Sequence, residues 1–287
     1  MGICLPSPVD WNLTPLASLL LNVGLLGLCG LVLLLLSKNF SVIKGKGGIL
    51  TLLFLVTSVS FPWAPGGLLT TSLILALGML LCLGILFSAY RKSNAARQLF
   101  LMATILAVGS MVQYSFLIMS IPLLIVAATF KSLRLREVIA FAMGLCAPYW
   151  IALGLMLIPV DCLRLPEPMT LWNGMPSHTA IFTGLANLGF TAVVSLILGL
   201  NNGMKLYAGN TRRRMFNMAV DIVQAAALIA MILDFNNMTA YVVTFFMGAT
   251  FQYTNIFSLW NLRRPWIWLT GICAVYIAFL ILAYMYL

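Results

Sequence analysis

Few residues in this chain are suited to acid–base chemistry: six are Asp or Glu and one is His, among 287. Asp161 and Glu167 lie in a proline-rich stretch, 159–179, and Asp10 lies near the start of the sequence. A carboxylate that reaches a substrate proton can act as a general acid or base. We therefore take Asp10, Asp161 and Glu167 as the candidate catalytic residues.

The proline-rich stretch also holds the residue types that bind metals. Asp161, Cys162, Glu167 and His178 would supply four ligands, but their spacing fits no recognised metal-site pattern. Nothing in the sequence resembles a phosphate-binding glycine loop, a nucleophile elbow or a zinc-binding helix. We expect neither a metal nor another cofactor.

Asp221 differs from these acids because it lies within an apolar segment, 215–234, with Gln224 one turn further on the same helical face. An ionisable side chain inside a membrane is a functional hypothesis, since burying it without a partner is expensive. Asp221 would relay a proton or cation, or contact a substrate. The alternative is that it lies near the cytoplasmic headgroups and pairs with Arg212–Arg214. Gln113 is a further polar residue, suited to an interhelical hydrogen bond or a tight turn.

Two groups of arginines could contact lipid phosphate. Arg212, Arg213 and Arg214 form the densest cationic cluster, and Arg134 and Arg136 belong to a second basic strip. Basic side chains at the cytoplasmic leaflet attract anionic headgroups. The alternative is that both groups serve only to fix the orientation of the chain in the membrane.

The elements that position these residues follow from the composition. Hydrophobic residues make up 62% of the chain and charged residues 8%, whereas a soluble domain carries roughly 25% charged residues. Mean hydropathy is +1.06, which predicts an integral membrane protein. A net charge of +10 would indicate nucleic-acid binding in a soluble protein. Here Lys and Arg mark cytoplasmic loops instead, so we expect no nucleic-acid partner.

The apolar runs predict an all-α fold, a polytopic transmembrane helical bundle of about ten helices, several of them short and paired. A spanning helix requires about 20 apolar residues. The expected segments are 14–37, 49–63, 67–90, 98–113, 115–130, 137–158, 180–201, 215–234, 238–260 and 265–286. They form a single integral membrane domain, 1–287, whose one substantial outer loop is 159–179.

The charges predict the orientation of this domain. With the first segment entering from outside, all of the 16 Lys and Arg residues except Arg164 fall in inner loops. Both termini then face the periplasm of a bacterial inner (cytoplasmic) membrane. Cys4 and Cys162 fall on the outer side, where they form a disulfide or remain free thiols.

Several short motifs resemble those of one protein family. They are the polar pair Gln113–Tyr114, the basic strip Lys131–Arg134, the step Arg136–Glu137, and Gly144 followed by Pro148–Tyr149. Together they resemble a family of uncharacterised multi-pass inner-membrane proteins from Bacteroidota. Members of that family usually begin with one further helix after a basic N-terminus. The resemblance implies a compartment and a lineage rather than a reaction.

Two functions fit these observations. The first is a non-catalytic subunit or scaffold of a larger cell-envelope membrane complex, which explains the scarcity of acids and the small loops. Its partners are the lipid bilayer and other membrane-protein subunits. The alternative is a glycosyltransferase-like membrane enzyme or a transporter that handles a polyprenyl-linked sugar or another lipid intermediate, with chemistry on the outer face. A polyprenyl or anionic lipid would then be a partner. A transporter would use Asp221 and helices broken near Pro122 and Pro148.

Overall fold

The computed structural model describes residues 14–40, 43, 46–61, 68–92, 94–130, 133–156, 178–207, 211–260 and 264–285. Within these ranges every regular element is a helix. The helices are α1 (Pro15–Phe40), α2 (Gly47–Val59), α3 (Leu68–Ala89), α4 (Ala96–Val112), α5 (Ser115–Ile118), α6 (Ser120–Thr129), α7 (Leu135–Gly154), α8 (His178–Tyr207), α9 (Thr211–Leu233), the 3-10 helix η4 (Phe235–Tyr241), α10 (Val242–Leu259) and α11 (Pro265–Met285). The predicted all-α bundle is confirmed. Helices α5 and α6 together correspond to the single predicted span 115–130.

Six of these helices are long and apolar enough to cross a membrane, namely α1, α3, α7, α8, α9 and α11. Shorter apolar helices are α2, α4 and the α5–α6 pair. A spanning helix must satisfy its own backbone hydrogen bonds in lipid, and an α-helix does so internally. The chain is therefore a multi-pass membrane protein.

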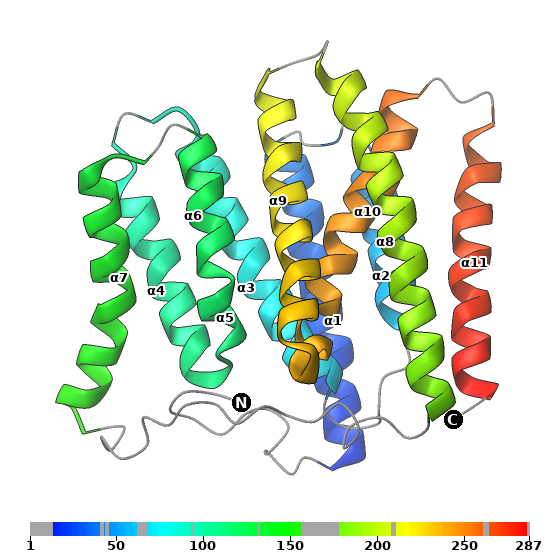
Figure 1. The fold of residues 1–287 in the computed structure, drawn as a ribbon, viewed down its shortest axis with the longest axis horizontal. Helices are drawn as coiled ribbons and strands as arrows, with labels where there is room; N and C mark the ends of the chain where they lie inside the picture. The colour runs from blue at the N-terminus through cyan, green and yellow to red at the C-terminus, as the bar shows by residue number, and fades with distance from the viewer. Residues whose placement is uncertain are drawn as a thin grey trace.

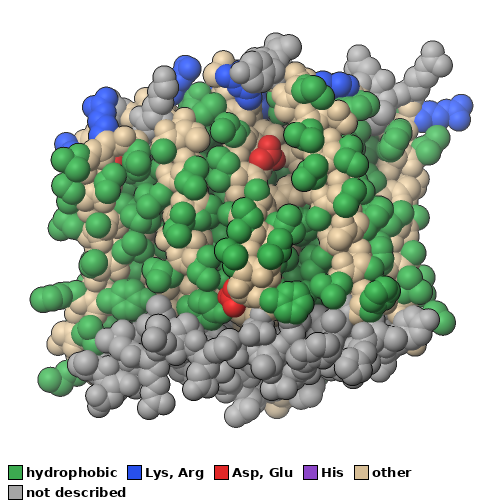
Figure 2. Space-filling model, viewed as in Figure 1, with side chains coloured by type: hydrophobic (Ala, Val, Ile, Leu, Met, Phe, Trp, Pro, Cys, Tyr) green, Lys and Arg blue, Asp and Glu red, His purple; other side chains and the backbone are tan. Residues whose placement is uncertain are grey.

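Successive helices alternate in direction when α5 and α6 are counted as one, and α7 and α11 stand at the two ends of the long axis (Figure 1). The connections after α1, α3, α6, α8 and α10 consequently fall on one edge of the bundle. Figure 2 shows Lys and Arg side chains gathered along one edge of the face in view, with hydrophobic side chains covering the width beneath them. This one-sided distribution is the pattern that the charge count predicts.

The break expected near Pro122 is present. The span 115–130 is interrupted at Met119, because Pro122 has no N–H to offer the carbonyl of Ile118 four residues earlier. The helix boundaries correct the sequence prediction at two other places. The expected break at Pro148 is wrong, since α7 continues through this proline. Helix α9 begins at Thr211 rather than at 215, which places its arginines in its first turn.

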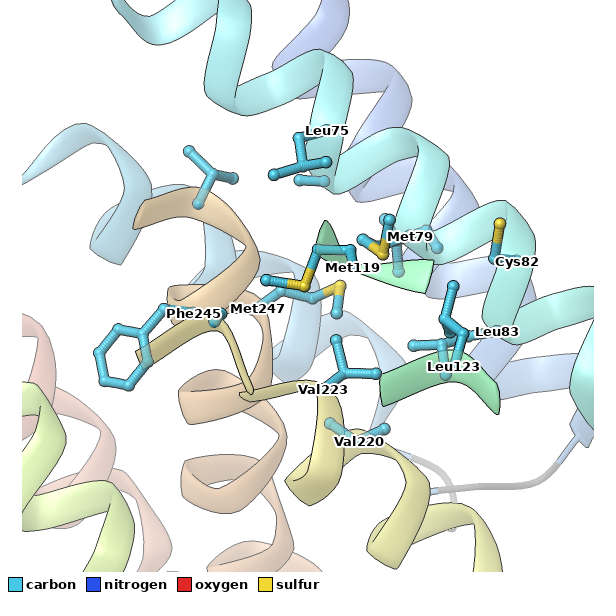
Figure 3. Packing of buried hydrophobic residues seen from close by; sticks show 14 of the residues in the cluster. Leu75, Met79, Cys82, Leu83, Met119, Leu123, Val220, Val223, Phe245 and Met247 are labelled. Atoms are coloured by element: carbon cyan, nitrogen blue, oxygen red, sulfur yellow. The ribbon is translucent and has the colours of Figure 1, made fainter. Parts of the chain in front are cut away.

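Helix α10 forms the centre of the bundle. Its residues 242–257 are all buried, and it packs against α2, α3, α8 and α9. Polar residues nevertheless occur along its length, including Thr244, Thr250, Gln252 and Asn255. Figure 3 shows the apolar core beside it, where Met79 of α3, Met119 and Val223 approach Met247 of α10.

Glycines allow several of the helices to approach closely. A Cβ atom at Gly144 in α7 would lie 2.5 Å from the backbone oxygen of Phe100 in α4. The α4–α7 contact is completed by a 2.6 Å hydrogen bond between the hydroxyls of Ser110 and Tyr149. Small residues at such interfaces are typical of membrane helices, because dispersion contacts rather than hydrophobic burial hold them together.

Candidate functional site

Asp221 lies near the middle of α9, whereas one of the two sequence interpretations placed it near the cytoplasmic headgroups. It is ten residues beyond Thr211, which corresponds to roughly 15 Å along the helix axis. Arg214 lies seven residues earlier, roughly 10 Å closer to the basic edge. This depth places the carboxylate within the apolar width of the bundle rather than among the headgroups.

Amide side chains, rather than arginines, provide the hydrogen bonds to this carboxylate. Asn217, one turn earlier on α9, donates from Nδ2 to Asp221 Oδ2 at 3.1 Å. Gln252 of α10 donates from Nε2 to Asp221 Oδ1. Amide donors can stabilise an ionised carboxylate, because each presents an N–H dipole to the oxygen. The hydrogen bonds of Asp221 are thus made to amides, whereas the alternative interpretation paired it with Arg212–Arg214.

A chain of amides connects the site to Arg213. Asn255 of α10 donates to Asn217 Oδ1 at 2.6 Å, and its own Oδ1 accepts from Arg213 Nη2 at 3.5 Å. Arg213 also donates to Ser258 Oγ at 2.6 Å. The arginine and the aspartate therefore belong to one hydrogen-bonded chain that joins α9 to α10.

The same chain extends to α8 through Gln252. Asn202 of α8 donates from Nδ2 to Gln252 Oε1 and to its backbone oxygen, both at 3.0 Å. The indole of Trp260 donates to Asn202 Oδ1 at 3.3 Å, and the Lys205 ammonium lies 3.5 Å from the centre of that ring. Three helices thus hold the side chains around Asp221 in fixed positions.

Gln224 faces the same space as Asp221, as their spacing predicts. Its Nε2 donates to Ser195 Oγ of α8 at 2.7 Å, and Ser195 donates to the Ala192 carbonyl at 3.2 Å. A Cβ atom at Gly248 of α10 would lie 2.4 Å from Gln224 Cβ, so this glycine permits the close approach of α9 and α10.

A pocket of about 350 Å³ lies between α8 and α9, with Asp221 and Gln224 in its lining. Its walls are mainly apolar and include Leu196 and Leu200 of α8, Leu228 of α9 and Phe245 of α10. Volumes in this range are typical of small-molecule sites. The pocket combines one carboxylate with an apolar enclosure.

The rim of the pocket lies on the outer surface of the bundle. Leu196 is 61% exposed and Leu200 is 65% exposed, and Ala225 on the opposite rim is exposed as well. In a membrane these surfaces face hydrocarbon, so the pocket opens sideways toward lipid. Its geometry suits a molecule that enters from the bilayer with a polar head and an apolar body.

Gln113 and Tyr114 form a turn between α4 and α5, as one of the two sequence interpretations predicted. The turn is closed by a 2.8 Å hydrogen bond from the Leu117 N–H to the Tyr114 carbonyl. Gln113 is 1% exposed, and neither polar atom of its side chain has a hydrogen-bond partner within the described residues.

Beside this turn, Asp234 accepts hydrogen bonds from three side chains. Tyr114 and Tyr241 donate from their hydroxyls, the latter at 3.2 Å, and Asn237 donates from Nδ2 at 3.5 Å. Burial raises the pKa of the Tyr114 phenol above its ordinary value, and the hydrogen bond to Asp234 and the charge of that carboxylate raise it further. The phenol therefore stays protonated and fastens the α4–α5 turn to the end of α9.

The other predicted site residues are dispersed. Asp10, Asp161 and Glu167 lie outside the described residues, as do Cys4 and Cys162, so their roles stay predictions. In the part of the chain that is described, no three His, Cys, Asp or Glu residues come together as a metal site would require.

The arginines lie near helix starts, where a headgroup contact is geometrically reasonable. Arg134 precedes α7 and Arg136 lies in its first turn, while Arg212 and Arg214 lie in the first turn of α9. The Arg212 guanidinium also lies 5.3 Å from the centre of the Phe216 ring. Binding of lipid phosphate by these groups stays a prediction.

Comparisons with family models, curated proteins and solved structures found no match for this chain. Membership in the Bacteroidota family stays a prediction that rests on the motifs described above. Functional inference consequently depends on the geometry of the site.

Sequence reasoning identified Asp221 and Gln224 but missed Asn217, Ser195 and Asn202. A signal for Asn217 was present, because it precedes Asp221 by four residues and so lies on the same helical face. Ser195 and Asn202 lie on a different helix, and nothing in the sequence pairs them with α9 or α10.

Proposed function

We propose that this protein takes up a lipid-like amphiphile from the bilayer and handles it as a membrane transporter. The observation that carries the proposal is the pocket between α8 and α9, which opens toward lipid and holds a carboxylate at mid-helix depth. An intramembrane ionisable group that faces a cavity is typical of substrate and ion pathways. The proposal follows the transporter version of the alternative predicted above, with a lipid intermediate as cargo.

The sequence analysis placed any chemistry on the outer face of the membrane, whereas the proposed site lies nearer the basic edge. Asp221 is closer to the basic edge than to Asp234 at the opposite end of α9, because ten residues separate it from Thr211 and thirteen from Asp234. We place the basic edge in the cytoplasm of a bacterial inner membrane, with both termini periplasmic. The amphiphile would then enter from the cytoplasmic half of the bilayer.

Photolabelling in nanodiscs tests the proposal. The probes are lipids with a diazirine in the acyl or prenyl chain: phosphatidylethanolamine, phosphatidylglycerol and undecaprenyl phosphate. Ala225→Trp places an indole at the rim and should reduce labelling of α8 and α9 peptides at least fivefold. Ile229→Trp is the matched control, one turn further along α9 and outside the pocket lining. Equal labelling of the two variants at pocket peptides would refute a lipid-binding pocket.

A second candidate function is the non-catalytic subunit of a larger cell-envelope complex. The observation that favours it is the exposure of the two end helices: Trp150 of α7 is 81% exposed, and the apolar window of α11 is 6% buried. Such faces can accept neighbouring transmembrane helices as well as lipid. Purification in mild detergent followed by mass spectrometry tests this role. Recovery of partners at fixed stoichiometry is expected, and recovery of a lone monomer would contradict it.

A further inference from the structure

The contacts of Asp221 indicate which headgroup the pocket accepts. The carboxylate receives hydrogen bonds from Asn217 and Gln252, and no cation of the described residues forms an ion pair with it. A carboxylate offers about four acceptor positions, so about two stay open to the pocket. A charged side chain at the centre of a membrane helix is costly, and a counter-ion reduces that cost.

The other polar groups that line the pocket are uncharged. Gln224 donates to Ser195, and Ser195 donates to the Ala192 carbonyl. Arg213 is bound to Ser258 and Asn255 toward the basic edge, and Asn255 and Asn217 connect it to Asp221. The charged group that the lining offers to a headgroup is therefore the Asp221 carboxylate. It would attract a cation.

We propose that the pocket binds an amphiphile whose head is a protonated amine, with the Asp221 carboxylate as its counter-ion. The ammonium group donates to the open carboxylate positions, and the alkyl chain lies along Leu196, Leu200 and Leu228. This inference rests on the proposed function, because it requires that the pocket take up an amphiphile. It adds a charge selectivity that the shape of the pocket alone does not impose.

Three photoreactive probes with the same diazirine-bearing alkyl chain test the selectivity, one each with an amine, a hydroxyl and a carboxylate head. The protein is placed in nanodiscs of phosphatidylglycerol, which contain no competing amine. Labelling of α8 and α9 peptides by the amine should exceed labelling by the other two at least tenfold. Asp221→Asn should remove that preference, and Asp221→Glu should retain most of it. Thermal unfolding of each variant shows whether the fold survives.

Competition identifies the source of the amine. Phosphatidylethanolamine should displace the amine probe, and free ethanolamine at the same concentration should not, because it lacks the chain that contacts the apolar walls. If free ethanolamine displaced the probe and phosphatidylethanolamine did not, the proposal of an amphiphilic ligand would be overturned. The pocket would then be a site for a small organic cation.

The outcomes separate this inference from the proposed function. Equal labelling of pocket peptides by all three heads, unchanged in Asp221→Asn, would overturn the charge selectivity while leaving the lipid pocket in place. Labelling by none of the probes, in a protein that unfolds normally, would overturn both.

Discussion

The contact between Gly248 and Gln224 gives the sharpest prediction on stability. A Cβ atom at Gly248 would lie 2.4 Å from Gln224 Cβ, whereas ordinary contact begins at 3.4 Å, a deficit of 1.0 Å. The obstructing atom is fixed to the α9 backbone and cannot rotate away. Gly248→Ala must therefore push α9 and α10 apart, at a cost of about 1–3 kcal/mol, the range measured for overpacked cores.

Gly271→Ala is the matched control for this variant. Gly271 lies on the exposed face of α11, and a Cβ atom there would meet nothing within 4 Å. Both changes share the gain of roughly 1 kcal/mol that alanine has over glycine in a helix. The difference between the two variants therefore isolates the steric cost.

Equilibrium unfolding by SDS in mixed micelles, monitored by tryptophan fluorescence, measures that difference. We expect Gly248→Ala to be less stable than Gly271→Ala by about 1–3 kcal/mol. Gln224→Gly removes the obstructing Cβ, so the double variant should lose less than the sum of the two single changes. Equal stability of the two alanine variants, or strict additivity in the double variant, would refute the packing of α9 on α10 described here.

Two further predictions concern the polar contacts away from the pocket. The pKa of Tyr114 is raised above 10.0 in the folded protein, so the stability that its proton contributes is complete below about pH 10 and is lost as pH rises further. Tyr114→Phe should flatten that part of the pH–stability curve from pH 9 to 11.5, and an unchanged slope would contradict the raised pKa. Tyr276→Phe should cost about 1 kcal/mol, because its hydroxyl lies 2.8 Å from that of Thr191 and 2.7 Å from that of Tyr253. Faster maleimide labelling of Cys273 on the same helix would show that α11 is loosened, and labelling at the unaltered rate would argue against this role.

The sequence predicts the spans well for a physical reason. Apolar length and alternating positive charge are consequences of the bilayer itself, and they act on each segment independently of the others. The interruption at Met119 also had a local cause, since Pro122 removes a donor from the helix.

The candidate site was predicted only in part, because its geometry depends on neighbouring helices. The depth of Asp221 depends on α9 starting at Thr211, before the apolar run begins. Its partner Gln252 lies on α10, 31 residues later. The polar residues of α10 give the best sequence signal for a central helix, because a helix surrounded by protein need not be uniformly apolar. That signal indicates burial but does not identify the helices that provide it.

The central position of α10 has a consequence for how the protein is made. Residues 242–257 are buried against α2, α3, α8 and α9, all of which are synthesised before it. Those four helices cannot close on one another until α10 has entered the membrane between them. Its amides and hydroxyls are also costly in lipid until they meet Asn202, Asn217 and Asp221. Biogenesis must therefore hold an incomplete bundle open until α10 has been translated.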